Sequence, residues 1–130
     1  MRASYYLKYL PGPGNYREAV AGVLSVMRNV SAPFGVSEAG KPNISATIFC
    51  TVADLTNGIY YYDSTLSPNI VWLDQRKLNL AVGAPVEELE LISNPGLVGD
   101  VTAGFNPTTP FKFMPAGEHG VEVSQTSPGA

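Results

Sequence analysis

Hydrophobic positions in the first thirty residues recur with the spacing of helices. Residues 3–10 crowd their apolar side chains too closely for β alternation, so a short helix is predicted there. Such a helix places four of them on one side: Ala3, Tyr6, Leu7 and Leu10. The prolines and glycines of residues 11–14 end it, because proline cannot continue a helix.

A second and better-marked helix is predicted after this break. Asn15 can cap its N-terminus, and Glu18 stands three residues later, as in a capping box. The apolar residues that follow form one stripe: Tyr16, Val20, Val23, Leu24 and Met27. The opposite stripe is small or charged: Arg17, Ala21, Ser25 and Arg28. The pattern predicts a helix that buries one face and ends near residues 29–30.

From residue 44 the pattern changes to the alternation of a β-strand. Within residues 44–53, five positions point the same way: Ile44, Ala46, Ile48, Cys50 and Val52. Asn57-Gly58 predicts a two-residue hairpin turn, followed by a strand over residues 59–63. Consecutive tyrosines at residues 60–62 give this strand large side chains on both faces, so we expect the hairpin to lie inside a layered structure.

The remainder of the chain is expected to hold one more strand, over residues 70–73, and then mostly loop. A short extended piece is predicted at residues 78–80, and residues 85–91 fit either a strand or one helical turn. The order helix, helix, strand, strand, strand, tail predicts an α+β layer pair, an antiparallel sheet with helices on one face.

Composition narrows the possible partners. The 130 residues fit one domain, with 45% hydrophobic and only 15% charged residues, against about 25% charged in an average domain. A net charge of −3 argues against a nucleic-acid partner. No apolar run approaches the roughly 18 residues of a membrane span, and the N-terminus lacks the pattern of a secretion signal. We therefore expect no nucleic-acid partner and no membrane span, and the compartment stays open.

Few residues carry reactive chemistry. One Cys and one His exclude a disulfide framework and a Cys/His zinc site, so we expect no metal and no cofactor. Cys50 could act as a nucleophile with His119 as its base. The interpretation we favour is an inert core thiol, because Cys50 lies in the middle of an apolar strand.

Two further groups allow a functional and a structural interpretation. Asp54, Asp63 and Asp74 lie at or near strand ends and could form a carboxylate cluster, although ordinary turn chemistry is favoured. The tyrosines of residues 60–62 could stack on a ligand, although a place in the core is favoured.

Several segments of the chain resemble the choloylglycine hydrolase family, which contains bile salt hydrolases and penicillin V acylases. The longest is TIFCTVADLTNGIYYY, residues 47–62. The others are residues 2–7, 18–20, 26–35, 67–74 and 110–113. The resemblance spans residues 2–114 and is greatest to the penicillin-acylase-like branch of Gram-negative bacteria.

The resemblance implies the C-terminal part of an N-terminal nucleophile hydrolase, whose fold is an αββα four-layer sandwich. We expect residues 1–114 to form this part and residues 115–130 a disordered tail. In the family the nucleophile is an N-terminal Cys whose own α-amino group serves as the base. Here Arg2 follows Met1. Arg2 matches the second Arg of a family motif of the type Ser-Arg-Phe-Val-Arg-Ala, and we expect it to be the non-catalytic Arg of the two.

Two interpretations of function follow from the resemblance. In the first, the chain is part of a linear amide C–N hydrolase that cleaves a small-molecule amide such as penicillin V or a bile-salt conjugate. It would then be inactive alone, and its partner would be the N-terminal half of the same enzyme. In the second, it is a non-catalytic fragment or a self-associating binding or structural module. Both predict an exposed apolar sheet face and unpaired strand edges.

Overall fold

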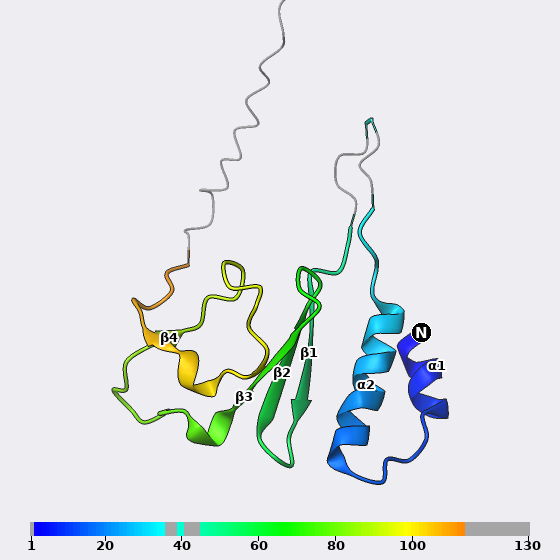
Figure 1. The fold of residues 1–130 in the computed structure, drawn as a ribbon, viewed down its shortest axis with the longest axis horizontal. Coiled ribbons are helices and arrows are strands. Elements are labelled where there is room, and N and C mark those ends of the chain that lie inside the picture. Colours follow the sequence, from blue (N-terminus) through cyan, green and yellow to red (C-terminus); the bar gives the residue numbers. More distant parts are fainter. Residues whose placement is uncertain (1, 36–38, 41–44, 114–130) are drawn as a thin grey trace, which may run out of the picture.

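A computed structural model describes residues 2–35, 39–40 and 45–113 (Figure 1). Two α-helices come first: α1 (Arg2–Tyr9) and α2 (Tyr16–Val30). The main sheet has four strands: β1 (Phe49–Asp54), β2 (Ile59–Ser64), β3 (Ile70–Asp74) and β5 (Gly99–Asp100). A small second sheet pairs β4 (Glu87–Glu88) with β6 (Asn106–Pro107). Two 3-10 turns complete the elements: η1 (Gln75–Lys77) and η2 (Thr102–Gly104).

The main sheet has the strand order β1-β2-β3-β5. The first three strands are antiparallel, and β5 joins the outer side of β3 in parallel. Figure 1 shows α2 between the sheet and α1, while the chain after β3 lies on the other side of the sheet. The predicted α+β class, with an antiparallel sheet and helices on one face, is therefore confirmed.

Helix α2 begins where its capping residues predict. The Asn15 Oδ1 accepts a hydrogen bond from the Glu18 amide at 3.1 Å, and the Asn15 Nδ2 donates to Glu18 Oε1 at 2.9 Å. The Glu18 carboxylate also reaches back to the Gly14 amide, at 2.7 Å. The bonds from the Glu18 and Gly14 amides satisfy backbone donors that have no partner within the helix, and the side-chain bond holds the two capping residues together.

The buried arc of α2 is wider than the predicted stripe. Leu24 is buried as expected, but Val26 is buried more deeply, at 4% exposure. The physical reason is a second contact, with Leu10 just after α1: a Cβ at Gly22 would lie 3.0 Å from Leu10 Cδ2. Val26 lies one turn after Gly22 and so shares that flank. Helix α1 itself buries no residue, and Leu7, which the pattern places on the packed side, is 51% exposed.

Strand β1 confirms the predicted alternation but begins later than predicted. Cys50 and Val52 are buried, whereas Phe49 and Ala53 are exposed. Residues 45–48 are not in a strand. The Thr47 amide donates its hydrogen bond to Ala32 O, at 3.0 Å, and not to β2.

The hairpin loop is also longer than predicted. Because Asp54 pairs with Ile59, four residues (55–58) form the loop instead of two. The Asp54 Oδ1 accepts hydrogen bonds from the amides of Thr56 and Asn57, both at 3.1 Å, and this nucleates the longer turn. Gly58 closes it with a φ of 66°, a conformation that favours glycine.

The last third of the chain departs most from the sequence-based expectation. After β3 the chain turns through η1, so the extended piece predicted at residues 78–80 is absent. Of the two possibilities for residues 85–91, the strand is observed, as β4. Strand β5 was not predicted, since two residues carry no periodicity. The tail predicted at residues 115–130 lies outside the described residues.

Candidate functional site

Arg2 lies in the first turn of α1 with an exposed side chain. Helix α1 packs against α2 on the side away from the sheet (Figure 1). Its assignment as the non-catalytic Arg of the family motif stays a prediction.

The thiol of Cys50 has the surroundings of a structural side chain. It is 7% exposed, and its Sγ lies 3.3 Å from the Ser31 Oγ. The Ser31 hydroxyl donates its proton to Met27 O at 2.8 Å, so the Cys50 S–H is the donor toward Ser31. Because a nucleophilic cysteine must be accessible to its substrate, the burial of Cys50 favours the structural interpretation. His119, the base considered for Cys50, lies outside the described residues.

Each of the three aspartates has a separate partner. Asp54 caps the hairpin loop, and the hydrogen bond from the Asn57 side chain, at 2.6 Å, holds the pKa of Asp54 below its usual range. Asp63 forms an ion pair with Arg28 of α2, with 2.7 Å between Arg28 Nε and Asp63 Oδ2. These contacts join loop to strand and helix to sheet.

Asp74 caps η1 and binds Arg76, with 3.0 Å between Oδ1 and the Arg76 Nε, and this bond lowers the pKa of Asp74. Among residues 2–35, 39–40 and 45–113, no group of three Asp, Glu, His or Cys side chains is placed to hold a metal ion. The structure therefore supports the turn interpretation for Asp54 and Asp74, whereas Asp63 lies within β2 and pairs with a helix instead.

The tyrosines of β2 point to both faces of the sheet, as predicted. Tyr61 lies on the α2 side beside Trp72, with ring centroids 5.9 Å apart. Tyr62 lies on the opposite face and stacks on Phe49, with centroids 5.2 Å apart and an interplanar angle of 20°. All three tyrosines are half-buried and pack within the sheet layer. Tyr60 and Tyr62 also line cavities.

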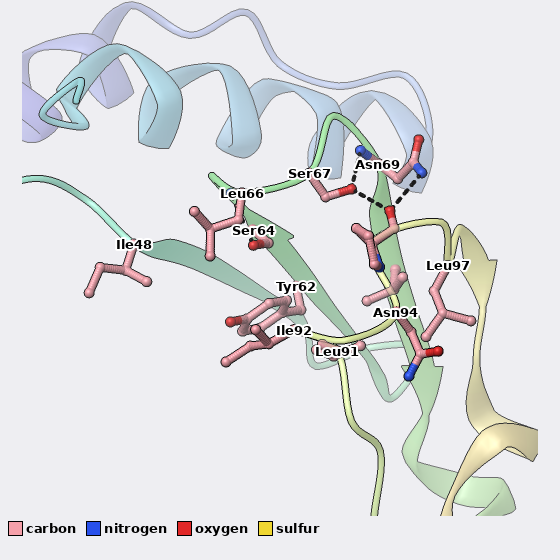
Figure 2. Close-up of a pocket in the computed structure, with 12 residues that line it drawn as sticks. Ile48, Tyr62, Ser64, Leu66, Ser67, Asn69, Leu91, Ile92, Asn94 and Leu97 are labelled. Carbon is pink, nitrogen blue, oxygen red and sulfur yellow. Dashed lines mark hydrogen bonds between the residues drawn. The ribbon is translucent and has the colours of Figure 1, made fainter.

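Those cavities lie on the sheet face away from the helices. The better enclosed one, of about 90 Å³, is drawn in Figure 2. Its apolar wall consists of Ile48, Tyr62, Leu66, Val71, Leu91, Ile92 and Leu97. Its polar rim consists of Ser64, Ser67, Asn69 and Asn94, and Pro95 completes the lining.

Hydrogen bonds fix the rim of this cavity between two segments distant in sequence. The Ser67 Oγ donates to Pro95 O at 2.9 Å, and the Asn69 amide donates to Ser67 Oγ at 3.2 Å (Figure 2). The lining contains no thiol, imidazole, carboxylate or cation. Such a cavity can hold a small apolar group, but it supplies neither a nucleophile nor a general base. The sequence did not reveal it, because the segment around Pro95 has no regular pattern.

None of the helices in the described part of the chain is long and apolar enough to cross a membrane.

Comparison with known proteins identifies the family. Residues 1–93 match the linear amide C–N hydrolases, choloylglycine hydrolase family. The penicillin V acylase of Pectobacterium atrosepticum is 34% identical over 128 residues, which cover 87% of this chain and 34% of that protein. The solved structure of penicillin V acylase from Agrobacterium tumefaciens superimposes with a TM-score of 0.73 at 39% identity, covering 87% of this chain and 37% of that one.

The match confirms the resemblance of the sequence segments and the fold class. The chain spans about a third of the length of these relatives. With its helix-covered sheet and its matched residues, the chain belongs to the choloylglycine hydrolase family of linear amide C–N hydrolases.

Proposed function

We propose that this chain supplies a helix-covered sheet to a linear amide C–N hydrolase of the penicillin V acylase type and does not hydrolyse amides by itself. The observation that carries the proposal is the buried position of Cys50. It is the single cysteine among the 130 residues, and it is a buried thiol that donates to Ser31. Cleavage of an amide by a cysteine needs an accessible thiolate with a base beside it.

The proposed substrate is a small-molecule amide, with penicillin V as the first candidate. Two relatives at 34% and 39% identity are named penicillin V acylases. In such a reaction a thiolate attacks the amide carbonyl, the amine leaves with a proton, and water releases the acyl group. We propose that the nucleophile and its base come from the polypeptide that corresponds to the rest of the relatives' length.

Reconstitution with that polypeptide tests the proposal. The purified chain is incubated with penicillin V alone, and again with the part of the Pectobacterium acylase that lies outside the match. Release of the primary amine is expected only from the mixture. Cys50→Ser serves as the control and should leave that activity unchanged. Turnover by the chain alone that disappears in Cys50→Ser would contradict the proposal.

The same mixture tests two smaller proposals. We propose that Arg2 is a surface residue of α1, so that Arg2→Ala keeps the reconstituted activity within about twofold. We also propose that residues 1–114 are the functional unit, so that deletion of 115–130 has no larger effect. A loss of activity greater than tenfold in either variant would show that the altered residues contribute to the site.

A second candidate function is a self-associating, non-catalytic module. It is favoured by apolar side chains that remain exposed, among them Ile48 at 64%, Phe49 at 52% and Phe111 at 79%. Large exposed apolar patches mark interaction surfaces. Light scattering at increasing protein concentration distinguishes the candidates: a monomer at every concentration contradicts the module, and a defined oligomer without reconstituted activity supports it.

A further inference from the structure

The loop between β1 and β2 contains Asn57-Gly58, the single Asn-Gly pair in the sequence. In such a pair the backbone nitrogen of the glycine attacks the side-chain Cγ of the asparagine, because no glycine side chain obstructs the approach. A C–N bond forms, ammonia leaves with the proton that the nitrogen gives up, and a cyclic succinimide results. Water then opens the ring to aspartate or isoaspartate, so the reaction consumes only water and releases ammonia.

In the folded loop, Asp54 holds the reacting side chain in place. The Asn57 Nδ2, which is the leaving group of this reaction, donates to Asp54 Oδ2 at 2.6 Å. The backbone amides of Thr56 and Asn57 both donate to Asp54 Oδ1 at 3.1 Å. Asn57 therefore places its backbone and side-chain nitrogens on the same carboxylate. The side-chain bond must break before ammonia leaves, and hydrogen bonds to a charged acceptor are the stronger kind in proteins.

A second effect of Asp54 is electrostatic. Attack on the Asn57 Cγ requires the Gly58 amide to lose its proton, so negative charge develops on the nitrogen that follows Asn57. The hydrogen bond from the Asn57 side chain, with those from the amides of Asn57 and Thr56, keeps the pKa of Asp54 below its usual range. Asp54 is therefore negatively charged at neutral pH, and a nearby like charge disfavours deprotonation of the amide.

Gly58 is held from its other side by η1. The Gln75 amide donates to Gly58 O at 2.9 Å. A Cβ at Gly58 would lie 3.3 Å from Arg76 Cγ, so the Arg76 side chain packs directly on the glycine. The two partners of the reaction are thus fixed separately, Asn57 by Asp54 and Gly58 by η1, and ring closure requires the loop to open first.

We propose that Asn57 is a deamidation site, that Asp54 keeps its reaction slow in the folded chain, and that the reaction opens the β1–β2 loop irreversibly. After the reaction, residue 57 carries a carboxylate where an amide donated to Asp54 at 2.6 Å, so two acceptors of like charge face each other. Isoaspartate also lengthens the backbone before Gly58 and displaces its bond to Gln75. This inference does not depend on the proposed function.

The rate of deamidation tests the role of Asp54. The purified chain is incubated at neutral pH, digested, and its peptides are followed by mass spectrometry, since the change of amide to acid raises the mass. We expect Asp54→Ala to accelerate the reaction at Asn57 by about tenfold or more, because the reaction proceeds from the open loop. Glu88→Ala, which removes an exposed carboxylate from the second sheet, is the matched control and should leave the rate unchanged.

The native chain provides the same test without a substitution, in case Asp54→Ala fails to fold by circular dichroism. Unfolding in urea should accelerate the reaction at Asn57 by about tenfold or more. Asn79, which is exposed and followed by Leu80, is the internal control in the same digest and should change less. Equal rates at Asn57 in the folded and the unfolded chain would overturn the inference, as would equal rates in Asp54→Ala and the native chain.

The opening of the loop is tested with Asn57→Asp, which reproduces one product of the reaction. We expect amide hydrogen exchange at Thr56 and Gln75 to accelerate by about tenfold or more. Asn57→Ala removes the same donor without adding a charge, so its effect should be smaller. If Asn57→Asp exchanges like the native chain, or no faster than Asn57→Ala, the carboxylate does not open the loop and the inference is overturned.

Discussion

The two faces of the main sheet are covered in different ways. On one face, α2 packs through residues that recur at helical spacing, and Leu24 and Val26 are buried against the sheet and α1. On the other face, the cover is a loop segment with two-residue strands, held by individual hydrogen bonds such as that from the Val101 amide to Trp72 O at 2.9 Å. One face therefore depends on regularly spaced helical packing. The other combines apolar contacts from irregular segments, which bury Val71 and Val101, with specific hydrogen bonds.

This contrast predicts the largest loss of stability on the helix-covered face. Leu24→Ala removes a side chain that is 7% exposed and leaves a cavity, at an expected cost of about 2–4 kcal/mol in the free energy of unfolding. Urea denaturation measures the loss. Leu80→Ala, at a position 77% exposed, is the control and should cost less than about 0.5 kcal/mol. Equal losses in both variants would show that α2 does not pack as described.

On the loop-covered face the sensitive group is a hydroxyl. The Thr102 Oγ1 accepts a hydrogen bond from the Asp74 amide at 2.8 Å and donates to the Asp100 carboxylate. Thr102→Val keeps the shape but leaves that amide without its partner, at an expected cost of about 1–2 kcal/mol. Exchange at the Asp74 amide should accelerate.

The control for this variant is Thr109→Val, at an exposed position of the same segment, which should change neither the free energy of unfolding nor the exchange at Asp74. If Thr102→Val behaves like Thr109→Val, the loop cover does not depend on this hydroxyl.

The cap of α2 tests the helix-covered face by a polar contact instead of packing. Asn15→Ala removes the acceptor of the Glu18 amide and should cost about 1 kcal/mol. The loss should appear as faster exchange in the first turn of α2. Asn15→Asp supplies the same acceptor and should retain most of the stability. If Asn15→Asp is as unstable as Asn15→Ala, the contribution of Asn15 comes from its side-chain NH2 group, which donates to Glu18 Oε1.

The smallest expected effect is a pH dependence on the loop-covered face. The hydrogen bond from the Thr102 side chain, with those from the Thr102 amide and Lys77, lowers the pKa of Asp100 to about 2. A carboxyl with a lowered pKa stabilises the fold above its unfolded pKa of about 3.9, and this contribution is lost as the pH falls toward 2.

Asp100→Asn should therefore lower the Tm by roughly 1–3 °C at pH 7 and leave it unchanged near pH 2. The effect is small because the Asp100 side chain is 44% exposed and water screens its charge. Thermal unfolding followed by circular dichroism at both pH values checks it. A Tm difference that persists at pH 2 would assign the effect to shape rather than charge.

Much of the fold was predictable where a regular pattern repeats. Asn15 and Glu18 mark the start of α2, and the alternation around Cys50 and Val52 places both residues inward. The position of the turn at Asn57-Gly58 was predicted correctly, but its length was not. The side chain of Asp54 accepts two backbone hydrogen bonds and so stabilises a longer loop than the dipeptide alone suggests.

The candidate site was less predictable. The sequence correctly indicated that Cys50 is structural, since a cysteine within an apolar strand is usually buried. It did not indicate the cavity, because Ser67 and Pro95 meet across an intervening strand and a long loop. Contacts between irregular segments leave no periodic signal in the sequence.

By itself the sequence determined the two helices, the three antiparallel strands and the family, since local periodicity, capping and matched segments all lie within short stretches of chain. Only the tertiary structure decided that β5 joins β3 in parallel, that Asp63 binds Arg28, and that β1 is the end strand of the main sheet within the described residues. These features depend on residues far apart in the chain, and the apolar packing and polar pairing that bring them together are properties of the folded molecule.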